Sequence, residues 1–338
     1  MSGGQYRRGV NIAGAAFGSS SLPGVLGRDY TFESEATYQY FGTKGLGLIR
    51  FALQWERLQP IPSGPLDPTY LANLKQVINW ATAHDCSVIL NLHNYGRYSF
   101  VTELGLTPCI IDNPEGDLRI TRYDLADLWR RLSSEFKFEP AVCAYGLMNE
   151  PHDMTGGDWK TISQASVDAI RANQDGKLIL VPGDSWSTAN RWAQVNGPVS
   201  WISDPADNFA YEAHVYFDTD EGGTYAKSYD EELSINPDLA EVGRTRVSRF
   251  ISWCQSNNVQ GMVGEYGIPG DEPRRISVLD NFLSALDLAQ MDGTYWAAGE
   301  WWGDYRLSVQ PTANFTMDRP QMPTLLSHVT FEHFFLIE

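Results

Sequence analysis

Short runs of apolar and β-branched residues alternate along the chain with longer stretches in which apolar residues recur every three or four positions. The runs are typical of buried strands, and the stretches are typical of amphipathic helices. Their regular alternation predicts parallel βα units. The eight strands predicted in this way span residues 8–13, 46–53, 87–92, 142–148, 178–182, 209–215, 261–264 and 293–297.

The helices between these strands are predicted from the same pattern. The face over 125–136 is preceded by Thr121 and Asp124, which have the spacing of a capping box. A helix near 188–195 has only a weak pattern. The remaining helical faces span residues 71–81, 162–170, 247–254 and 276–286.

Eight strands with intervening helices indicate an α/β protein with a closed (β/α)8 TIM barrel. We expect a single catalytic domain over 1–338, with 1–7 as a short N-terminal leader, because no linker or repeat interrupts the pattern. A doubly wound open sheet has the same periodicity, but no G-x-G-x-x-G follows the first strand. The long polar insertion at 217–239 is expected to form a wall of a cleft.

Barrel enzymes carry their sites at the C-terminal ends of the strands. Candidate site residues are therefore the polar and aromatic residues at the end of each apolar run. This rule selects Arg50 after the second run, His93 after the third, Asn149 and Glu150 after the fourth, His214 and Tyr216 after the sixth, Glu265 after the seventh, and Trp296 on the eighth.

Glu150 and Glu265 follow non-adjacent strands, so a barrel places them across its mouth from each other. Retaining cleavage of a glycoside requires two carboxyl groups about 5 Å apart, one to attack the anomeric carbon and one to protonate the leaving oxygen. The acid must hold its proton until substrate binds, while the nucleophile must be ionised. Arg50 is the natural partner of Glu265, because a guanidinium lowers the pKa of a nearby carboxylate, and Tyr216 is a second candidate donor.

The composition restricts the partners. A formal net charge of −17 argues against nucleic acid and anionic membranes, and no apolar run approaches the roughly 18 residues of a membrane span. Eleven tryptophans are many for this length; most are expected in the core, but exposed ones suit the apolar faces of sugar rings. The four cysteines form no C-x-x-C pair, which removes the usual zinc and redox readings and leaves disulfides open.

Several strings at the predicted strand ends resemble glycoside hydrolase family 5, whose members are retaining (β/α)8 hydrolases. They are GLMNEP at 146–151, NLHNY at 91–95, HVY at 214–216 and GEYG at 264–267, and the similarity extends from GVN at 9–11 to WAAG at 296–299 and WWGDY at 301–305. One string alone would be weak. Together, in this order and at these strand ends, they are strongly specific.

The resemblance implies that Glu150 is the general acid/base and Glu265 the nucleophile. It implies that Asn149 hydrogen-bonds the sugar 2-hydroxyl and that Trp296 is the platform under the sugar on the non-reducing side. The stretch 218–224, the run 93–98 and the Trp-rich tail look most like the endoglucanase branch, and Asn94 in that run is expected to be a substrate-binding residue. The remaining polar shell around the cleaved bond would be Arg50, His93, His214 and Tyr216.

The chain departs from the family pattern in two places. The segment that begins at Tyr225 lacks the cysteines of many secreted fungal relatives, so their disulfides are not carried over. Trp55 stands where a smaller residue is expected, and we expect it to alter one subsite.

Several residues also have a purely structural interpretation. Trp186 and Trp301 are candidate stacking platforms, with core packing as the alternative. For Trp55, Tyr95 and Tyr98, sugar stacking and core packing are both open. Glu56 and Arg57 are expected to form a structural pair. His93 and His214 are metal ligands on an alternative reading, but no third ligand with suitable spacing accompanies them.

The sequence therefore predicts a retaining endo-β-1,4-glucanase that needs no metal or organic cofactor and whose partner is a β-glucan chain. The same chemistry on mannan, xyloglucan or a mixed-linkage glucan is the first alternative. A catalytically silent carbohydrate-binding barrel and a metal-dependent lyase or aldolase are two others. We expect a secreted protein, since insoluble polysaccharide cannot enter a cell. We also expect a monomer with no nucleic acid or membrane partner.

Overall fold

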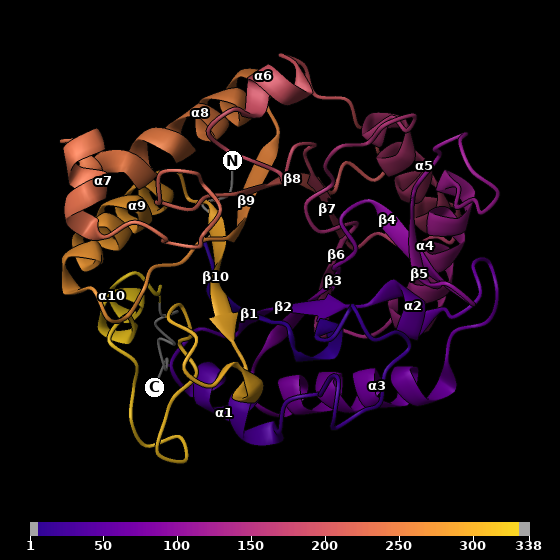
Figure 1. Cartoon of the computed structure of the whole chain (residues 1–338), viewed down its shortest axis with the longest axis horizontal. Helices are drawn as coiled ribbons and strands as arrows, with labels where there is room; N and C mark the ends of the chain where they lie inside the picture. The colour runs from indigo at the N-terminus through magenta and orange to yellow at the C-terminus, as the bar shows by residue number, and fades with distance from the viewer. Residues whose placement is uncertain (1–5, 331–338) are drawn as a thin grey trace, which may run out of the picture.

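The computed structural model describes residues 6–330 and contains a closed barrel of eight parallel strands with an outer ring of helices (Figure 1). The strands follow one another round the barrel in the order β1-β10-β9-β8-β7-β6-β3-β2. All eight predicted strands are present, and the (β/α)8 class is confirmed. The barrel strands are β1 (Arg8–Ile12), β2 (Leu48–Leu53), β3 (Ser87–Leu92), β6 (Val142–Gly146), β7 (Leu178–Pro182), β8 (Phe209–His214), β9 (Gln260–Glu265) and β10 (Asp292–Ala298).

Two of the candidate residues lie differently from the prediction with respect to their strands. Arg50 is the third residue of β2 rather than a residue after its end, and it is buried. Glu265 is the last residue of β9 rather than the first residue beyond it. Alternate residues of a barrel strand point inward, so a side chain within a strand can reach the same interior space as one at its end.

The helices agree with the predicted faces and add several that the pattern did not indicate. The capping box at Thr121 and Asp124 is formed, and the weak helix near 188–195 is only the short α6. The helices are α1 (Glu35–Thr43), α2 (Trp55–Leu58), α3 (Pro68–Ala83), α4 (Arg122–Phe136), α5 (Trp159–Ala172), α6 (Trp192–Asn196), α7 (Tyr229–Ile235), α8 (Val242–Asn257), α9 (Ile276–Leu288) and α10 (Met322–Ser327), with 3-10 turns η1 (Gly14–Ala16), η2 (Leu239–Glu241), η3 (Pro273–Arg275) and η4 (Glu300–Trp302).

A two-stranded antiparallel hairpin follows β3 and was not predicted. It consists of β4 (Arg97–Thr102) and β5 (Gly105–Ile110) and lies outside the barrel sheet. The insertion at 217–239, which follows β8, contains α7 and the start of η2. Both segments leave the barrel at the C-terminal ends of strands, which is the end where the candidate residues lie.

The two largest parts of the core lie outside and inside the barrel sheet, as expected when strands alternate their side chains between the inside of a barrel and its helical cover. The large outer part lies between strands and helices and includes the fully buried Trp129 and Trp192. The inner part is a small apolar layer made of Leu48, Ile89, Ala144, Leu180, Ala210 and Met262, one residue from each of six strands.

Other expectations concern the ends and the cysteines. Residues 1–5 of the predicted leader lie outside the described residues, whereas Arg7 pairs with Asp292 at 2.8 Å. All four cysteines are free: Cys86, Cys109, Cys143 and Cys254. Within residues 6–330 no helix has the length and apolarity needed to cross a membrane.

Candidate active site

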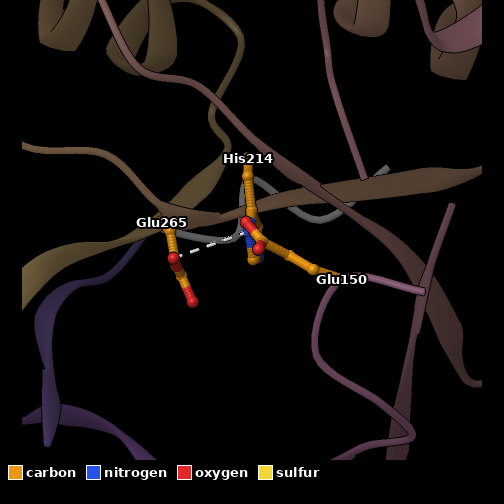
Figure 2. A group of neighbouring side chains, drawn as sticks. All are labelled: Glu150, His214 and Glu265. Carbon is orange, nitrogen blue, oxygen red and sulfur yellow. Dashed lines mark hydrogen bonds and ion pairs between the residues drawn. The ribbon is translucent and has the colours of Figure 1, made fainter. Parts of the chain in front are cut away.

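Three ionisable side chains meet at the C-terminal mouth of the barrel. Glu150 lies just beyond β6, His214 ends β8 and Glu265 ends β9. One carboxylate oxygen of Glu150, one of Glu265 and one ring nitrogen of His214 all lie within 4.8 Å of one another. Figure 2 shows Glu150 extending toward His214 and a dashed line joining His214 to Glu265. The two carboxyl groups therefore have the short separation that double displacement at a glycosidic bond requires.

Both oxygens of Glu265 are held by neighbouring donors. Arg50 donates from Nη1 to Oε1 at 2.9 Å, and the Tyr216 hydroxyl donates to Oε2 at 2.9 Å. His214 Nδ1 lies 3.6 Å from Oε2. The Glu265 side chain is only 5% exposed, so its position is fixed by these contacts. The expectation that Arg50 and Tyr216 would serve this carboxylate agrees with the geometry.

The ionisation of Glu265 reflects opposing influences. Burial raises its pKa and the neighbouring Glu150 raises it further, whereas His214, Arg50 and Tyr216 lower it; on balance the pKa lies above that of a free glutamate. Arg50 alone thus does not make this carboxylate unusually acidic.

Glu150 has fewer partners and more access to solvent. His214 Nδ1 lies 2.7 Å from Glu150 Oε1, and the Glu150 side chain is 16% exposed. Its backbone adopts a φ of 44°, a left-handed conformation that is uncommon for a residue with a side chain. Glu150 also lines a pocket of about 410 Å³ together with Trp186, Asn190 and residues of the insertion at 217–239. The carboxyl group can thus meet a bound molecule from this side.

His214 carries the positive charge of this group. Burial alone would lower its pKa, but Glu265, Glu150 and Glu212 outweigh burial and raise the pKa to about 10. The imidazole is therefore protonated at neutral pH, and each ring nitrogen can donate to a carboxylate. His93, in contrast, has its pKa lowered by burial and by the nearby charges of Arg50 and His214, so it is neutral.

Arg50 ties several strands together inside the barrel. Besides Glu265, it donates to Asn11 Oδ1 at 2.8 Å and to Asn149 Oδ1 at 2.8 Å, and it forms an ion pair with Glu212 at 2.7 Å. Asn11 and Glu212 were not predicted. Each is a polar residue within an apolar run, and that break in the pattern is the signal that could have identified them.

Aromatic side chains occupy one side of the site. The His93 ring stacks on Trp296 with centroids 5.5 Å apart, and the Tyr95 hydroxyl lies 3.1 Å from His93 Nε2. Trp302 packs edge-on against Trp296. The neutral His93 thus fixes the orientation of the Trp296 ring.

Two other tryptophans are partly open to solvent. Trp186 is 44% exposed and stacks on His152 with centroids 4.4 Å apart. Trp301, on η4, is 42% exposed. Of the two, Trp186 lines the pocket beside Glu150.

The structure does not bring Asn94 into this group. Its amide oxygen accepts from the Trp55 backbone N–H at 2.8 Å and its amide nitrogen donates to Glu56 at 2.8 Å, and the side chain is buried. Asn94 therefore uses both ends of its side-chain amide to hold the start of α2. These contacts direct Asn94 away from the substrate-binding role that the resemblance implies.

Other expectations near α2 need correction. Trp55 is fully buried and packs on Tyr98, so neither forms a wall of the cleft or alters a subsite directly. Glu56 and Arg57 are structural, but they do not pair with each other. Glu56 accepts from Asn94 and the Ser99 backbone, while Arg57 donates to three backbone carbonyls, those of Ala15, Gly18 and Pro23.

Glu150, His214 and Glu265 are close enough to act together as ligands of a metal ion. However, His214 already contacts carboxylates through both ring nitrogens, and Arg50 brings a second positive charge to the same place. Both cations, Arg50 and His214, contact the carboxylates of Glu212 and Glu265. Two positive side chains already neutralise carboxylates at this place, which suits an acid–base pair better than a cation site.

Comparisons with known proteins agree on one family. The model of the cellulase family, glycosyl hydrolase family 5, matches residues 10–303. Endo-β-1,4-glucanase A of Emericella nidulans is 31% identical over 309 residues, which cover 90% of this chain and 87% of the relative. A probable endo-β-1,4-glucanase B of Aspergillus oryzae is 32% identical, over 90% and 84% of the two chains.

Solved structures give the same result. The endoglucanase Cel5A of Pseudomonas stutzeri superposes with a TM-score of 0.84 at 35% identity, covering 96% of this chain and 94% of that one. An endo-β-1,4-glucanase of Xanthomonas axonopodis pv. citri has a TM-score of 0.84 at 36% identity, with coverage of 96% and 98%.

Proposed function

The chain belongs to the cellulase family, glycosyl hydrolase family 5, as a retaining endo-β-1,4-glucanase, and we propose that Glu265 and Glu150 carry out its two chemical steps. The observation that supports this assignment most strongly is the placement of the two carboxyl groups. One oxygen of each lies within 4.8 Å of the other, and Glu265 is held on both oxygens while Glu150 faces the pocket.

In the first step, Glu265 Oε attacks the anomeric carbon of the sugar on the non-reducing side of the bond. The bond to the glycosidic oxygen breaks with its electron pair, and Glu150 gives its proton to that oxygen. The products of this step are a glycosyl ester on Glu265 and a shorter chain with a free hydroxyl. In the second step, Glu150 takes a proton from water, the water oxygen attacks the anomeric carbon, and Glu265 leaves as a carboxylate. Two inversions give net retention.

The neighbouring groups position the reacting atoms. Arg50 and Tyr216 hold one oxygen of Glu265 each, which fixes the attacking atom without consuming substrate-binding energy. Asn149 uses its amide oxygen to accept from Arg50, which leaves its amide nitrogen as the proposed donor to the sugar 2-hydroxyl. That bond strengthens as positive charge develops on the ring in the transition state.

Aromatic side chains lie on both sides of the position proposed for the cleaved bond of the polysaccharide. Trp296, supported by His93, is the proposed platform for the sugar on the non-reducing side of the cleaved bond. Trp186 and the insertion at 217–239 line the pocket on the Glu150 side, where the leaving part of the chain would lie. Trp301 is proposed as a more distant stacking surface.

The substrate is a polysaccharide, and we propose cellulose or a related β-1,4-glucan, as in the endoglucanases to which the chain is similar. Mannan, xyloglucan and mixed-linkage glucan are the alternatives, because the shell around the cleaved bond does not by itself fix the orientation of the sugar 2-hydroxyl. We also propose a secreted monomer with one catalytic domain over 1–338 that needs no cofactor, on the ground that polymeric cellulose is met outside cells.

The test is hydrolysis of a soluble β-1,4-glucan, with viscosity and reducing ends measured in parallel. Wild type should lower the viscosity quickly while producing few new ends, and Glu265→Gln should do neither. Asp175→Asn removes a buried carboxylate that accepts from Tyr145 and Ser133 away from the site, and it should keep the wild-type pattern. Activity retained by Glu265→Gln would refute the nucleophile, and activity on mannan alone would refute the substrate.

The two roles are separated by small-molecule rescue. Azide should restore activity to Glu265→Ala with inversion at the anomeric carbon, because the anion fits the vacated space. Glu150→Ala should cleave activated aryl glycosides far better than natural chains, since their leaving group needs little protonation. The opposite pattern would exchange the two assignments.

A further inference from the structure

A buried glutamate beneath the reacting groups is not used by the mechanism above. Glu212 lies on β8 two residues before His214, so the two side chains point to the same face of the strand, into the barrel. The Glu212 side chain is completely buried. A charged group in this position is costly unless its surroundings compensate for the loss of water.

One oxygen of Glu212 receives two donors. Arg50 Nη2 lies 2.7 Å from Glu212 Oε1, and His214 Nε2 lies 3.1 Å from the same oxygen. The second oxygen has no partner among the described residues. A side chain at Gly264 would place its first carbon 2.2 Å from Glu212 Oε1, so the glycine leaves the room that this carboxylate occupies.

These contacts connect Glu212 to both proposed reacting groups. Through Arg50 it reaches Glu265, because the other end of the guanidinium donates to the nucleophile at 2.9 Å. Through His214 it reaches Glu150, because the opposite ring nitrogen lies 2.7 Å from Glu150 Oε1. One carboxylate thus touches the supports of the acid/base and of the nucleophile at the same time.

The protonation of His214 decides which atoms can donate. A doubly protonated ring donates from Nε2 to Glu212 and from Nδ1 to Glu150 Oε1, which leaves the other Glu150 oxygen to carry the acid proton toward the leaving group. A neutral ring that donates from Nε2 to Glu212 would have to accept at Nδ1, and it would then take the Glu150 proton out of the reaction.

Several other charged or titratable groups face the His214 ring, and they act in both directions. Glu150 and Glu265 favour its protonation, while burial and the cationic Arg50 oppose it. Among residues 6–330, the titratable and charged groups around the ring and Glu212 are Arg50 on β2, His93 after β3, Glu150 after β6, Tyr216 after β8 and Glu265 on β9. Glu212 contacts both of the facing atoms, Arg50 Nη2 and His214 Nε2, which lie 3.4 Å apart. Without Glu212, Glu265 would still contact both cations, but through their other nitrogen atoms.

We propose that Glu212 is a positioning residue that keeps His214 doubly protonated, so that His214 donates to Glu150 and leaves the Glu150 proton free for the leaving oxygen. The effect on catalysis rests on the proposed function, whereas the effect on His214 does not.

The first test is the titration of His214, followed by NMR of the ring C–H groups in protein labelled at its six histidines. The His214 signal, identified by its loss in His214→Gln, should not shift between about pH 5 and 8 in wild type. In Glu212→Gln, which keeps the shape but removes the charge, it should titrate within this range. Glu212→Asp keeps the charge and should behave as wild type.

The matched control is Asp204→Asn. Asp204 is fully buried and pairs with Arg171 at 2.7 Å in the loop before β8, at the opposite end of the barrel from the site. This variant removes the charge of another buried carboxylate–arginine pair, and it should leave the titration of His214 and the pH profile unchanged even if its melting temperature falls.

The second test is activity. Glu212→Gln should lose about 10- to 100-fold in kcat/KM on a cello-oligosaccharide, by analogy with the loss of a carboxylate that orients a metal-bound imidazole. The loss on an aryl cellobioside with a good leaving group should be smaller, because that substrate needs no proton from Glu150. Glu212→Asp should recover part of the activity.

A His214 signal that still does not move between about pH 5 and 8 in folded Glu212→Gln would overturn the inference. If that variant does not fold, wild type decides: ordinary titration near the free value of about 6.5 overturns the inference, and a flat signal supports it. A titration as expected, together with full activity of Glu265→Gln on glucan, would instead leave the role of Glu212 standing and refute the proposed function.

Discussion

The hydroxyl of Tyr216 gives the most selective perturbation of the proposed nucleophile. It donates to Glu265 Oε2 at 2.9 Å, and the Tyr216 ring packs with Tyr225 and Leu307. Tyr216→Phe therefore removes one hydrogen bond and keeps the ring and its contacts. The other oxygen of Glu265, Oε1, still accepts a hydrogen bond from Arg50 in this variant.

The size of the effect follows from the hydrogen bond. A bond to a charged group contributes about 1.5–3 kcal/mol, and one pKa unit corresponds to about 1.36 kcal/mol, so the expected change is about 1–2 units. The Tyr216 bond lowers the pKa of Glu265, so its loss must raise that pKa. Because attack requires the carboxylate, the acidic limb of the kcat/KM profile should move to higher pH by about 1–2 units.

The assay is kcat/KM on an aryl cellobioside across pH, compared with thermal unfolding. Tyr145→Phe is the control, since Tyr145 is also buried and donates to a carboxylate, Asp175, at 2.7 Å but does not contact the site. It should lower stability without moving the limb. An acidic limb that stays in place or moves to lower pH in Tyr216→Phe would refute the assignment of this bond to Glu265.

Three further outcomes are expected. Gly264→Ala should lower both stability, by about 1–3 kcal/mol measured in urea, and kcat, because its methyl group would meet Glu212; unchanged stability would contradict the packing. Trp186→Ala should raise KM for long cello-oligosaccharides up to about tenfold, the equivalent of about 1.4 kcal/mol of stacking, and leave a short aryl glycoside unaffected; equal effects on both would place Trp186 outside the leaving-group side. Dialysis against a chelator should leave the rate on soluble glucan unchanged, because Arg50 and His214 supply the positive charge at the site, and a loss restored by one metal ion would contradict this.

The fold was predictable because its signals are periodic. Each barrel strand is a short apolar run, and the carboxyl ends of parallel strands meet at one mouth, so Glu150, His214 and Glu265 could be brought together from their positions alone. The hairpin of β4 and β5 was missed because it lies in what the pattern treats as a loop after β3, and because Pro108 interrupts the second of its strands.

Contacts within the site were less predictable. Asn94 follows His93 directly, yet a turn with φ of 55° at Tyr95 begins there and the Asn94 side chain is directed to α2 instead. Glu212 was missed because it lies inside a predicted strand, and residues inside a strand were assumed to pack in the core. Only the side-chain geometry shows that this polar residue lies where Arg50 and His214 converge.

The central claim, that Glu265 is the nucleophile, is tested most directly by trapping the glycosyl ester. A 2-deoxy-2-fluoro-β-cellobioside with a good leaving group destabilises the charged transition state of both steps, and the leaving group lets the first step proceed, so the ester accumulates. Peptide mapping by mass spectrometry should place one 2-deoxy-2-fluorocellobiosyl group on the peptide that contains Glu265, with Glu150 unmodified. An adduct on Glu150 or on any other side chain, or steady turnover with no adduct, would contradict the account.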